Sequence, residues 1–298
     1  MNSPSLRTPA SIPRFHLLAY VISHLTGAAA VNDGSVVRNS DVGCGNGNPI
    51  AHLNAFPVQM HPLMHLKIYS FDVVGHGVQG MKFIEQKVAC CITAVPDVYW
   101  SRAIYTSCAT AVRPFDNDIF KVVLPNQMFE HVHGHEGFFR QAHWVLKTGG
   151  APIRLFLLKH CAYQGPLHLP WVHRIRFDIS VGGFVALLSR RGLGKYPANP
   201  RETGCSLDVS TNRHADYLFF WTRYMSAAEA LDTVRKADLR ISYRYTGVFY
   251  LQKIFSLLRR PSLMAYRHEG RNWSEAVAVK ILRFFSSITP TCDKPCRY

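Results

Sequence analysis

The residues from Asp41 to Pro49 read DVGCGNGNP, and three glycines alternate with other residues in this run. Glycine tolerates positive φ and lets a ligand approach the backbone closely. Asn48 is a good helix N-cap, and Pro49 suits the first helical position, where a missing N–H costs nothing. The run therefore predicts a strand, a tight loop and a helix, which together build a nucleotide site at the carboxyl edge of a parallel sheet. It is not the G-x-G-x-x-G dinucleotide fingerprint, because its last glycine comes one residue early.

Strands and helices are expected to alternate along the rest of the chain. Apolar runs predict strands at Val36–Val42, Leu66–Phe71, Ile119–Leu124, Ile153–Leu158 and Leu239–Tyr245. Residues 50–56 and 138–146 have helical spacing, and Gly149-Gly150 is expected to end the second of these helices. Residues 215–237 are expected to be helical, and Ala276–Leu282 is either a last, antiparallel strand or a helix. This alternation predicts an α/β fold with a doubly wound, parallel sheet.

Four further segments follow the glycine loop in a fixed order. They are Phe71-Asp72, Arg113–Val123 (RPFDNDIFKVV), Asn126–Val132 (NQMFEHV) and Phe139–Gly150 (FRQAHWVLKTGG). Together with the loop, they resemble the class I S-adenosylmethionine-dependent methyltransferases with a methyltransferase type 11-like domain. The resemblance covers residues 37–160 and weakens beyond them. It implies a Rossmann-like, mostly parallel seven-stranded sheet with helices on both faces, and a transferase that uses S-adenosyl-L-methionine.

The resemblance also implies which residues bind the cofactor. They are Asp41, Gly43, Cys44, Gly45, Gly47, Asp72, Asn126 and Gln127. The backbone of the three glycines would approach the methionine and ribose portions, and Asp41 would support the ammonium end through water. Asp72 would accept both ribose hydroxyls at the end of the second strand. The Asn-Gln pair would lie beside the sulfonium, at the end of the fourth strand.

Glu130 and His131 are the candidate catalytic residues, because either side chain can take a proton from an attacking hydroxyl. Glu130 could instead cap the helix that follows the fourth strand. His131, His133 and His135 alternate, so in an extended segment they would share one face and could bind a metal. Surface histidines without a ligand are the commoner case, and we assign no metal to them.

Two positions depart from the family pattern. Ala109 stands where an acidic residue usually accepts a hydrogen bond from the adenine amine, and Lys121 replaces the usual aspartate before a Val-Val pair. The first strand is also polar at Arg38–Ser40, whereas central parallel strands are usually apolar throughout. The chain is therefore either a methyltransferase or a catalytically weak or inactive cofactor-binding protein on the same fold.

The chain has 298 residues, 48% of them hydrophobic, which is long enough for one α/β domain with additions. We expect an N-terminal helical extension at residues 1–36 and a cofactor-binding core at residues 37–160. Residues 161–298 would hold a substrate-lid insertion and complete the same domain. Their aromatic and histidine-rich segment 165–175 is either part of this lid or a packed surface excursion. No apolar run reaches the ~20 residues of a membrane span, and the scattered cysteines predict reduced thiols in a cytoplasmic protein.

Lys and Arg number 34 against 19 Asp and Glu, so the net charge is +15, which attracts polyanions such as RNA or anionic lipid. The expected substrate is a small-molecule or lipid-like acceptor that receives the methyl group by in-line displacement. Apolar and basic residues interleave at Tyr250–Arg283, which could contact an anionic membrane or pack onto the sheet with their charges in water. No long Lys/Arg block marks a nucleic-acid tail, so an RNA methyltransferase is the subordinate alternative.

Overall fold

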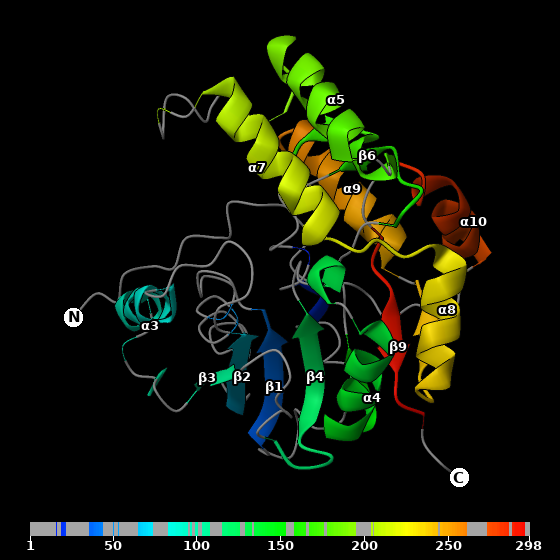
Figure 1. Ribbon diagram of the computed structural model, residues 1–298. Helices are drawn as coiled ribbons and strands as arrows, with labels where there is room; N and C mark the ends of the chain where they lie inside the picture. The colour runs from blue at the N-terminus through cyan, green and yellow to red at the C-terminus, as the bar shows by residue number, and fades with distance from the viewer. Residues whose placement is uncertain are drawn as a thin grey trace.

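A five-stranded parallel sheet in the order β3-β2-β1-β4-β5 runs through the centre of the chain (Figure 1). Its strands are β1 (Val36–Val42), β2 (His65–Val73), β3 (Ile104–Ser107), β4 (Phe120–Pro125) and β5 (Leu146–Pro152). The strand order reverses between β1 and β4, and open α/β sheets bind their ligands in the crevice at such a reversal. The α/β fold with a parallel central sheet is confirmed. The strands predicted at Val36–Val42, Leu66–Phe71 and Ile119–Leu124 correspond to β1, β2 and β4.

The structure is a computed structural model. It describes residues 16, 19–21, 36–43, 50, 53, 65–73, 83–94, 96, 99–100, 103–107, 115–125, 129–132, 134–152, 158–164, 167–175, 178–194, 204, 206–243, 245–260, 273–285 and 288–295. Residues 16 and 19–21, which belong to the predicted N-terminal extension, are helical. No helix in these ranges combines the length and the apolar character that a membrane crossing requires.

Two apolar cores cover the two faces of the sheet. On one face, residues 19–21 and α3 (Phe83–Ala94) lie in the same core as Val37 of β1. On the other face, α4 (His135–Val145) and α8 (Ala227–Lys236) contribute to the core that contains Val42 of β1. Side chains alternate along a strand, so β1 supplies both cores from its two faces. Helices on both faces confirm the doubly wound arrangement.

The strand β5 begins earlier in the sequence than the strand predicted at Ile153–Leu158. Phe120 pairs with Leu146 directly after α4, whereas Val122 pairs with Ala151, so residues 147–150 form a bulge in β5. Gly149 has a φ of +69°, and a Cβ on Gly150 would come within 2.7 Å of the Lys147 carbonyl oxygen. The prediction that Gly149-Gly150 ends the helix is therefore wrong, because both glycines shape the bulge. Of the strand predicted at Ile153–Leu158, all but Leu158 lies outside the described residues.

Strands β8 (Arg240–Ser242) and β9 (Thr291–Asp293) form a separate antiparallel pair at the β5 edge. The Gly149 N–H donates to the Lys294 carbonyl at 3.0 Å, and the Lys294 N–H donates to the Gly150 carbonyl at 2.9 Å. In the described part of the chain, the central sheet thus has five strands and not the expected seven. β8 lies within the strand predicted at Leu239–Tyr245.

The strand alternative for Ala276–Leu282 is wrong, because this segment lies in the helix α10 (Trp273–Leu282). The antiparallel strand is β9, which follows α10 in the sequence. Val277 and Ile281 are both exposed and stand four residues apart, which is the spacing of one helix face. A short apolar run fits both the helix and the strand period, so periodicity could not decide between them.

Residues 161–220 form a layer with a core of its own. The layer contains β6 (Tyr163–Gln164), β7 (Leu169–Pro170), η4 (Val172–Arg174), α5 (Asp178–Arg190) and α7 (Leu207–Phe220). Leu169, Val185 and Leu218 are buried in one cluster that is distinct from the two sheet cores. Figure 1 shows α5 and α7 above the arrowheads of β1 and β4, so this layer lies over the carboxyl edge of the sheet.

The N-terminal residues pack against the C-terminal part of the chain. The Nε2 of His16 lies 2.9 Å from the Oγ1 of Thr289, and its ring lies 4.8 Å from the ring of Phe249 on α9 (Thr246–Leu257). Burial lowers the pKa of His16 to about 3, so this side chain is neutral near pH 7. The contact therefore joins two polar groups without placing a charge in the core.

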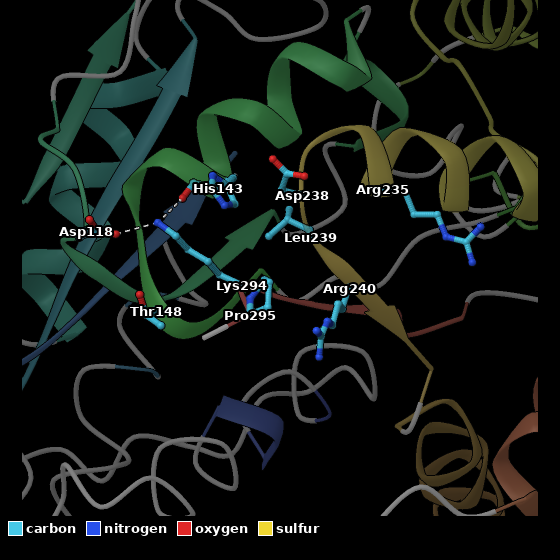
Figure 2. A pocket seen from close by; sticks show the side chains of 9 residues that line it. All are labelled: Asp118, His143, Thr148, Arg235, Asp238, Leu239, Arg240, Lys294 and Pro295. Carbon is cyan, nitrogen blue, oxygen red and sulfur yellow. Dashed lines mark hydrogen bonds and ion pairs between the residues drawn. The ribbon is translucent and has the colours of Figure 1, made fainter. Parts of the chain in front are cut away.

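Lys294 holds the end of α4 next to the turn before β4. Its Nζ donates to Asp118 Oδ1 at 2.7 Å and to the His143 carbonyl at 2.9 Å (Figure 2). It also donates to the Leu146 carbonyl at 2.7 Å. Carbonyls at a helix C-terminus carry partial negative charge, which a cation stabilises. The side chain of Lys294 is 14% exposed and that of Asp118 is 60% exposed. Solvent screens the ion pair, so the two carbonyl contacts contribute more of the stability.

We expect Lys294→Met to lower the free energy of unfolding by about 1–3 kcal/mol, because it leaves two carbonyls without their charged donor. Urea unfolding followed by circular dichroism measures the change. Lys147→Met is the matched control, since Lys147 is exposed on the β5 bulge, and it should leave the stability nearly unchanged. Equal stabilities for the two variants would contradict this role of Lys294.

Candidate functional site

The ends of three strands meet at one point of the sheet. Val42, the last residue of β1, pairs with Phe71 of β2 on one side and with Pro125 of β4 on the other. The chain therefore leaves β1 at Gly43 and β4 directly after Pro125, next to Phe71 and Asp72, which lie two residues and one residue before the end of β2. This point is the carboxyl edge at the reversal of strand order, where ligands bind in such folds.

Gly43 begins the glycine loop with a left-handed backbone. Its φ is +72°, and its N–H donates to the Phe71 carbonyl at 2.8 Å. A residue with a Cβ would be strained in this conformation, whereas glycine adopts it freely. The backbone thus turns sharply away from the sheet next to Asp72, the residue that follows Phe71 in β2.

The structure describes some of the predicted site residues. Asp41, Gly43, Glu130 and His131 are described, and Asp72 is described by its backbone, which pairs with Thr106 of β3. The predicted residues Cys44, Gly45, Gly47, Asn126 and Gln127 lie outside the described residues, as does Ala109.

Polar side chains are buried inside the central strand. Asn39, Ser40 and Asp41 of β1 are each at most 2% exposed, and Ser70, which pairs with Asp41, is fully buried. Buried polar groups are costly in the middle of a sheet. Asp41 lies two residues before Gly43, so its carboxylate is enclosed directly behind the start of the glycine loop. This position is compatible with an indirect role toward a ligand at the loop.

Glu130 lies in η3 (Phe129–His131), shortly after the end of β4. Its side chain is buried, and burial raises the pKa of the carboxyl group to about 7, although a backbone hydrogen bond acts against this shift. The Glu130 carbonyl accepts a hydrogen bond from the Arg223 N–H at 2.6 Å. A carboxyl group with a pKa near neutrality can both accept and release a proton at physiological pH.

His131 is oriented by the chain segment that follows α7. Its Nδ1 lies 2.5 Å from the Trp221 carbonyl oxygen, which can only accept a hydrogen bond, so Nδ1 carries the proton. The neutral ring therefore has its lone pair on Nε2, which lies 3.5 Å from the hydroxyl of Tyr217. An imidazole whose Nδ1 donates to a carbonyl keeps its lone pair on Nε2, which is the arrangement that general base catalysis uses.

Tyr217 of α7 forms a cluster with Glu130 and His131. The sequence analysis did not identify Tyr217. Burial, followed by the nearby carboxylate of Glu130, raises the pKa of the Tyr217 hydroxyl above its ordinary value. The hydroxyl is therefore neutral at physiological pH and can donate to Nε2 of His131. Tyr217 follows His131 by 86 residues, and no local sequence pattern connects the two.

His131 and His135, two of the three alternating histidines, lie in different elements. His131 lies in η3 and contacts the Trp221 carbonyl, whereas His135 begins α4 and its Nε2 lies 3.2 Å from the Phe129 carbonyl. The segment is thus not extended as a shared metal site would require, and His133 lies outside the described residues. Within the described ranges, no group of three metal-binding side chains gathers.

A cysteine and a histidine meet inside the 161–220 layer. The Sγ of Cys161 lies 3.4 Å from Nε2 of His173 and 3.4 Å from the Tyr163 carbonyl. Burial raises the pKa of Cys161 to about 11 and lowers that of His173 to about 4. Both groups are therefore neutral near pH 7, so the pair lacks the thiolate that a nucleophilic cysteine needs.

A polar pocket lies at the opposite edge of the sheet from the strand ends described above. Figure 2 shows its lining, which consists of Asp118, His143, Thr148, Arg235, Asp238, Leu239, Arg240, Lys294 and Pro295. Asp118 precedes β4 and Arg240 begins β8, so the pocket is at the amino edge. None of the predicted site residues that the structure describes lines it, and Lys294 inside it is already bonded to α4. We therefore do not assign it to the predicted site.

Comparison with known proteins identifies the part of the chain that contains the glycine loop. Residues 40–153 match the family model described as "Methyltransferase domain". This range includes β1 from Ser40 onward, β2, β3, β4, η3, α4 and β5. No curated protein matches the sequence at a significant level.

Solved structures give only distant matches. A geranyl diphosphate C-methyltransferase from Streptomyces coelicolor A3(2), in complex with Mg²⁺, geranyl diphosphate and S-adenosyl-L-homocysteine, has 14% identity and a TM-score of 0.41. That match covers 87% of this chain and 71% of the other. A possible histamine N-methyltransferase from Thermotoga maritima has 15% identity and a TM-score of 0.39, over 94% and 91% of the two chains. Matches of this strength do not assign a substrate.

We expect the stability of the protein to fall as the pH rises from about 4.5 to about 7, because of Glu130. In this window the folded state keeps a proton that the unfolded state has released. The slope is at most about 1.4 kcal/mol per pH unit, so the total loss over this window is on the order of 3 kcal/mol. Glu130→Gln cannot titrate and should remove this decline, which urea unfolding at a series of pH values measures.

The matched control for this prediction is Glu136→Gln on the partly exposed side of α4, which should keep the wild-type dependence on pH. If Glu130→Gln and the wild type show parallel stability curves, the carboxyl group of Glu130 is not held with a raised pKa.

Proposed function

We propose that this chain, in which residues 40–153 are a class I S-adenosylmethionine-dependent methyltransferase domain, transfers a methyl group to a small-molecule or lipid-like acceptor. The observation that supports the proposal most is the juxtaposition of two groups at one sheet edge. The ends of β1, β2 and β4 meet there, and the cluster of Glu130, His131 and Tyr217 follows β4 directly.

The residues at the strand ends fit the cofactor. Gly43 has the positive φ that a close backbone approach requires, and it lies next to Asp72 at the end of the neighbouring strand. A carboxylate at this place can accept hydrogen bonds from two ribose hydroxyls. We assign cofactor binding to Asp41, Gly43, Cys44, Gly45, Gly47, Asp72, Asn126 and Gln127, as the resemblance implies.

The catalytic assignment follows from the orientation of His131. Bound S-adenosylmethionine supplies an activated methyl group, so the protein has to align the acceptor and remove its proton. His131 accepts the proton of an acceptor hydroxyl on Nε2, while Nδ1 stays bonded to the Trp221 carbonyl. Glu130 is partly ionised near pH 7, and its carboxylate stabilises the imidazolium that results. The neutral Tyr217 hydroxyl donates to Nε2 before the acceptor replaces it.

We assign the parts of the chain to this reaction as follows. Residues 37–160 bind the cofactor, and residues 1–36 are an N-terminal helical extension, of which residues 19–21 lie in one core with Val37 of β1. Residues 161–298 cover the acceptor and complete the fold. The 161–220 layer lies over the carboxyl edge in Figure 1, and the ring of its Tyr217 contacts the ring of His131. Aromatic side chains favour an acceptor with an apolar body, which a lipid-like molecule has.

The first test is cofactor binding. Asp72→Ala should weaken the binding of S-adenosylhomocysteine by about 1–3 kcal/mol, because the ribose hydroxyls lose a charged acceptor. Isothermal titration calorimetry measures the affinity. Asp116→Ala is the matched control, since Asp116 is exposed before β4, and it should bind like the wild type. No heat of binding to the wild type at millimolar ligand would contradict the proposal as a whole.

The second test is methyl transfer. His131→Gln should lower incorporation from S-adenosyl-[methyl-³H]methionine into an extract of the source cells by about 10²–10⁴-fold, because Gln is not a base. His160→Gln is the control, since His160 is exposed and remote in sequence. Both variants should still bind S-adenosylhomocysteine.

The fraction that carries the label decides between the alternatives. Label in small molecules or lipids supports the proposed acceptor class, whereas label in RNA contradicts it. Binding of the cofactor without any transfer in the wild type would identify an inactive protein on the methyltransferase fold.

A further inference from the structure

Two helices that pack on each other, α9 and α10, both expose apolar side chains. On α9 and the turn after it, these are Leu251, Ile254, Leu257 and Leu258; on α10 and its following turn, they are Val277, Ile281, Phe284 and Phe285. Each is at least 39% exposed, and Leu257 is 83% exposed. Single exposed apolar residues are normal on a protein surface, but a contiguous group marks an interaction site. We call these eight side chains the α9–α10 surface.

α9 is apolar on both of its sides. Phe249 and Gln252 are almost fully buried on the side that faces the fold, whereas Leu251, Ile254 and Leu258 are exposed at helical spacing on the other side. A helix that covers a globular core normally carries polar residues on its outer face. The outer face of α9 therefore has the apolar composition of a surface that contacts a partner, and its side chains are exposed to solvent.

The two helices present their exposed side chains together. The Tyr250 hydroxyl on α9 donates to the Leu282 carbonyl at the end of α10 at 3.1 Å, and the two helices pack on each other. The turn after α10 also joins the 161–220 layer, because the Ala162 N–H donates to the Phe284 carbonyl at 2.5 Å. Figure 1 shows α9, like α5 and α7, above the sheet. The surface thus belongs to the same end of the molecule as the candidate site.

The charged side chains that the structure describes around this surface are basic. Arg259, Arg260 and Lys280 are exposed next to its apolar residues. Arg283 lies with its guanidinium carbon 4.7 Å from the ring centre of Phe284. In the sequences of α9, α10 and the turns after them, Glu275 is the one acidic residue. Apolar side chains bordered by cations match the acyl and phosphate layers of an anionic bilayer, and each basic residue near such a surface adds to the attraction.

We propose that the α9–α10 surface docks onto anionic lipid bilayers. Its apolar side chains enter the boundary between headgroups and acyl chains, and Arg259, Arg260 and Lys280 contact the headgroup phosphates. This is peripheral binding, which requires no spanning helix. The proposal does not depend on methyl transfer. If both hold, the docked protein faces the membrane with the end of the molecule that carries the candidate site.

Vesicle flotation of the full chain, without cofactor, tests the proposal. The protein should float with phosphatidylcholine vesicles that contain phosphatidylglycerol and should remain at the bottom with pure phosphatidylcholine. High salt should reduce flotation because it screens the headgroup attraction. Absence of flotation with the anionic vesicles at low salt, or equal flotation with both compositions, overturns the proposal.

Two isoleucines of equal exposure separate this surface from the general positive charge of the chain. Ile254 on α9 and Ile92 on α3 are each 50% exposed. Ile254→Glu should lower the partition coefficient by about tenfold or more, whereas Ile92→Glu should change it less than about twofold. Equal effects of the two variants would show that binding is non-specific and would overturn the assignment of the surface.

A charge reversal provides the second variant. Arg259→Glu combined with Arg260→Glu should lower partitioning by about tenfold or more and should make the remaining binding less sensitive to salt. Both residues are exposed, so the variant should fold, and its circular dichroism spectrum and S-adenosylhomocysteine binding should equal those of the wild type. Unchanged partitioning would overturn the proposal, and retained cofactor binding shows that this failure is separate from that of the proposed function.

Discussion

The pairing of β1 with two parallel neighbours is the constraint on which the site depends. Val42 pairs with Phe71 and with Pro125. The register of these three strands therefore places their carboxyl ends next to one another at one edge of the sheet. The Gly43 N–H then bonds to the Phe71 carbonyl, which starts the glycine loop in a left-handed turn. A shift of the β1–β2 register would separate Gly43 from Asp72, and a shift of the β1–β4 register would move the end of β4 away from both. The polar residues buried in β1 are tolerated inside a sheet whose two faces are otherwise covered by apolar cores.

A second constraint attaches the 161–220 layer to this edge. The Arg223 N–H bonds to the Glu130 carbonyl, and His131 donates to the Trp221 carbonyl. These contacts join η3, which follows β4, to the segment between α7 and α8. They bring Tyr217 to His131 and exclude water from Glu130, which raises its pKa. The same contacts thus orient the candidate base and set the protonation of its neighbours.

Local patterns in the sequence were sufficient for the features that depend on neighbouring residues. The glycine run predicted the turn at Gly43 and the strand before it, and apolar runs predicted β2 and β4, because burial on both faces leaves a largely continuous signal. The bulge at Gly149-Gly150 escaped prediction, since glycines end helices and shape bulges equally well. Tyr217 escaped because its role comes from a tertiary contact between distant segments. The helix α10 was ambiguous because its apolar outer face does not show the usual polar side.

The central claim is that the cofactor binds at the carboxyl edge and not in the polar pocket at the amino edge. Hydrogen–deuterium exchange with and without saturating S-adenosylhomocysteine tests it directly. The account predicts slower exchange in peptides that cover residues 37–47, 66–73 and 125–132, because a bound ligand protects the amides at these strand ends. Peptides that cover residues 236–243 and 290–295, which line the pocket, should exchange at the same rate in both states. Protection of the pocket peptides with no change at the strand ends would contradict the account.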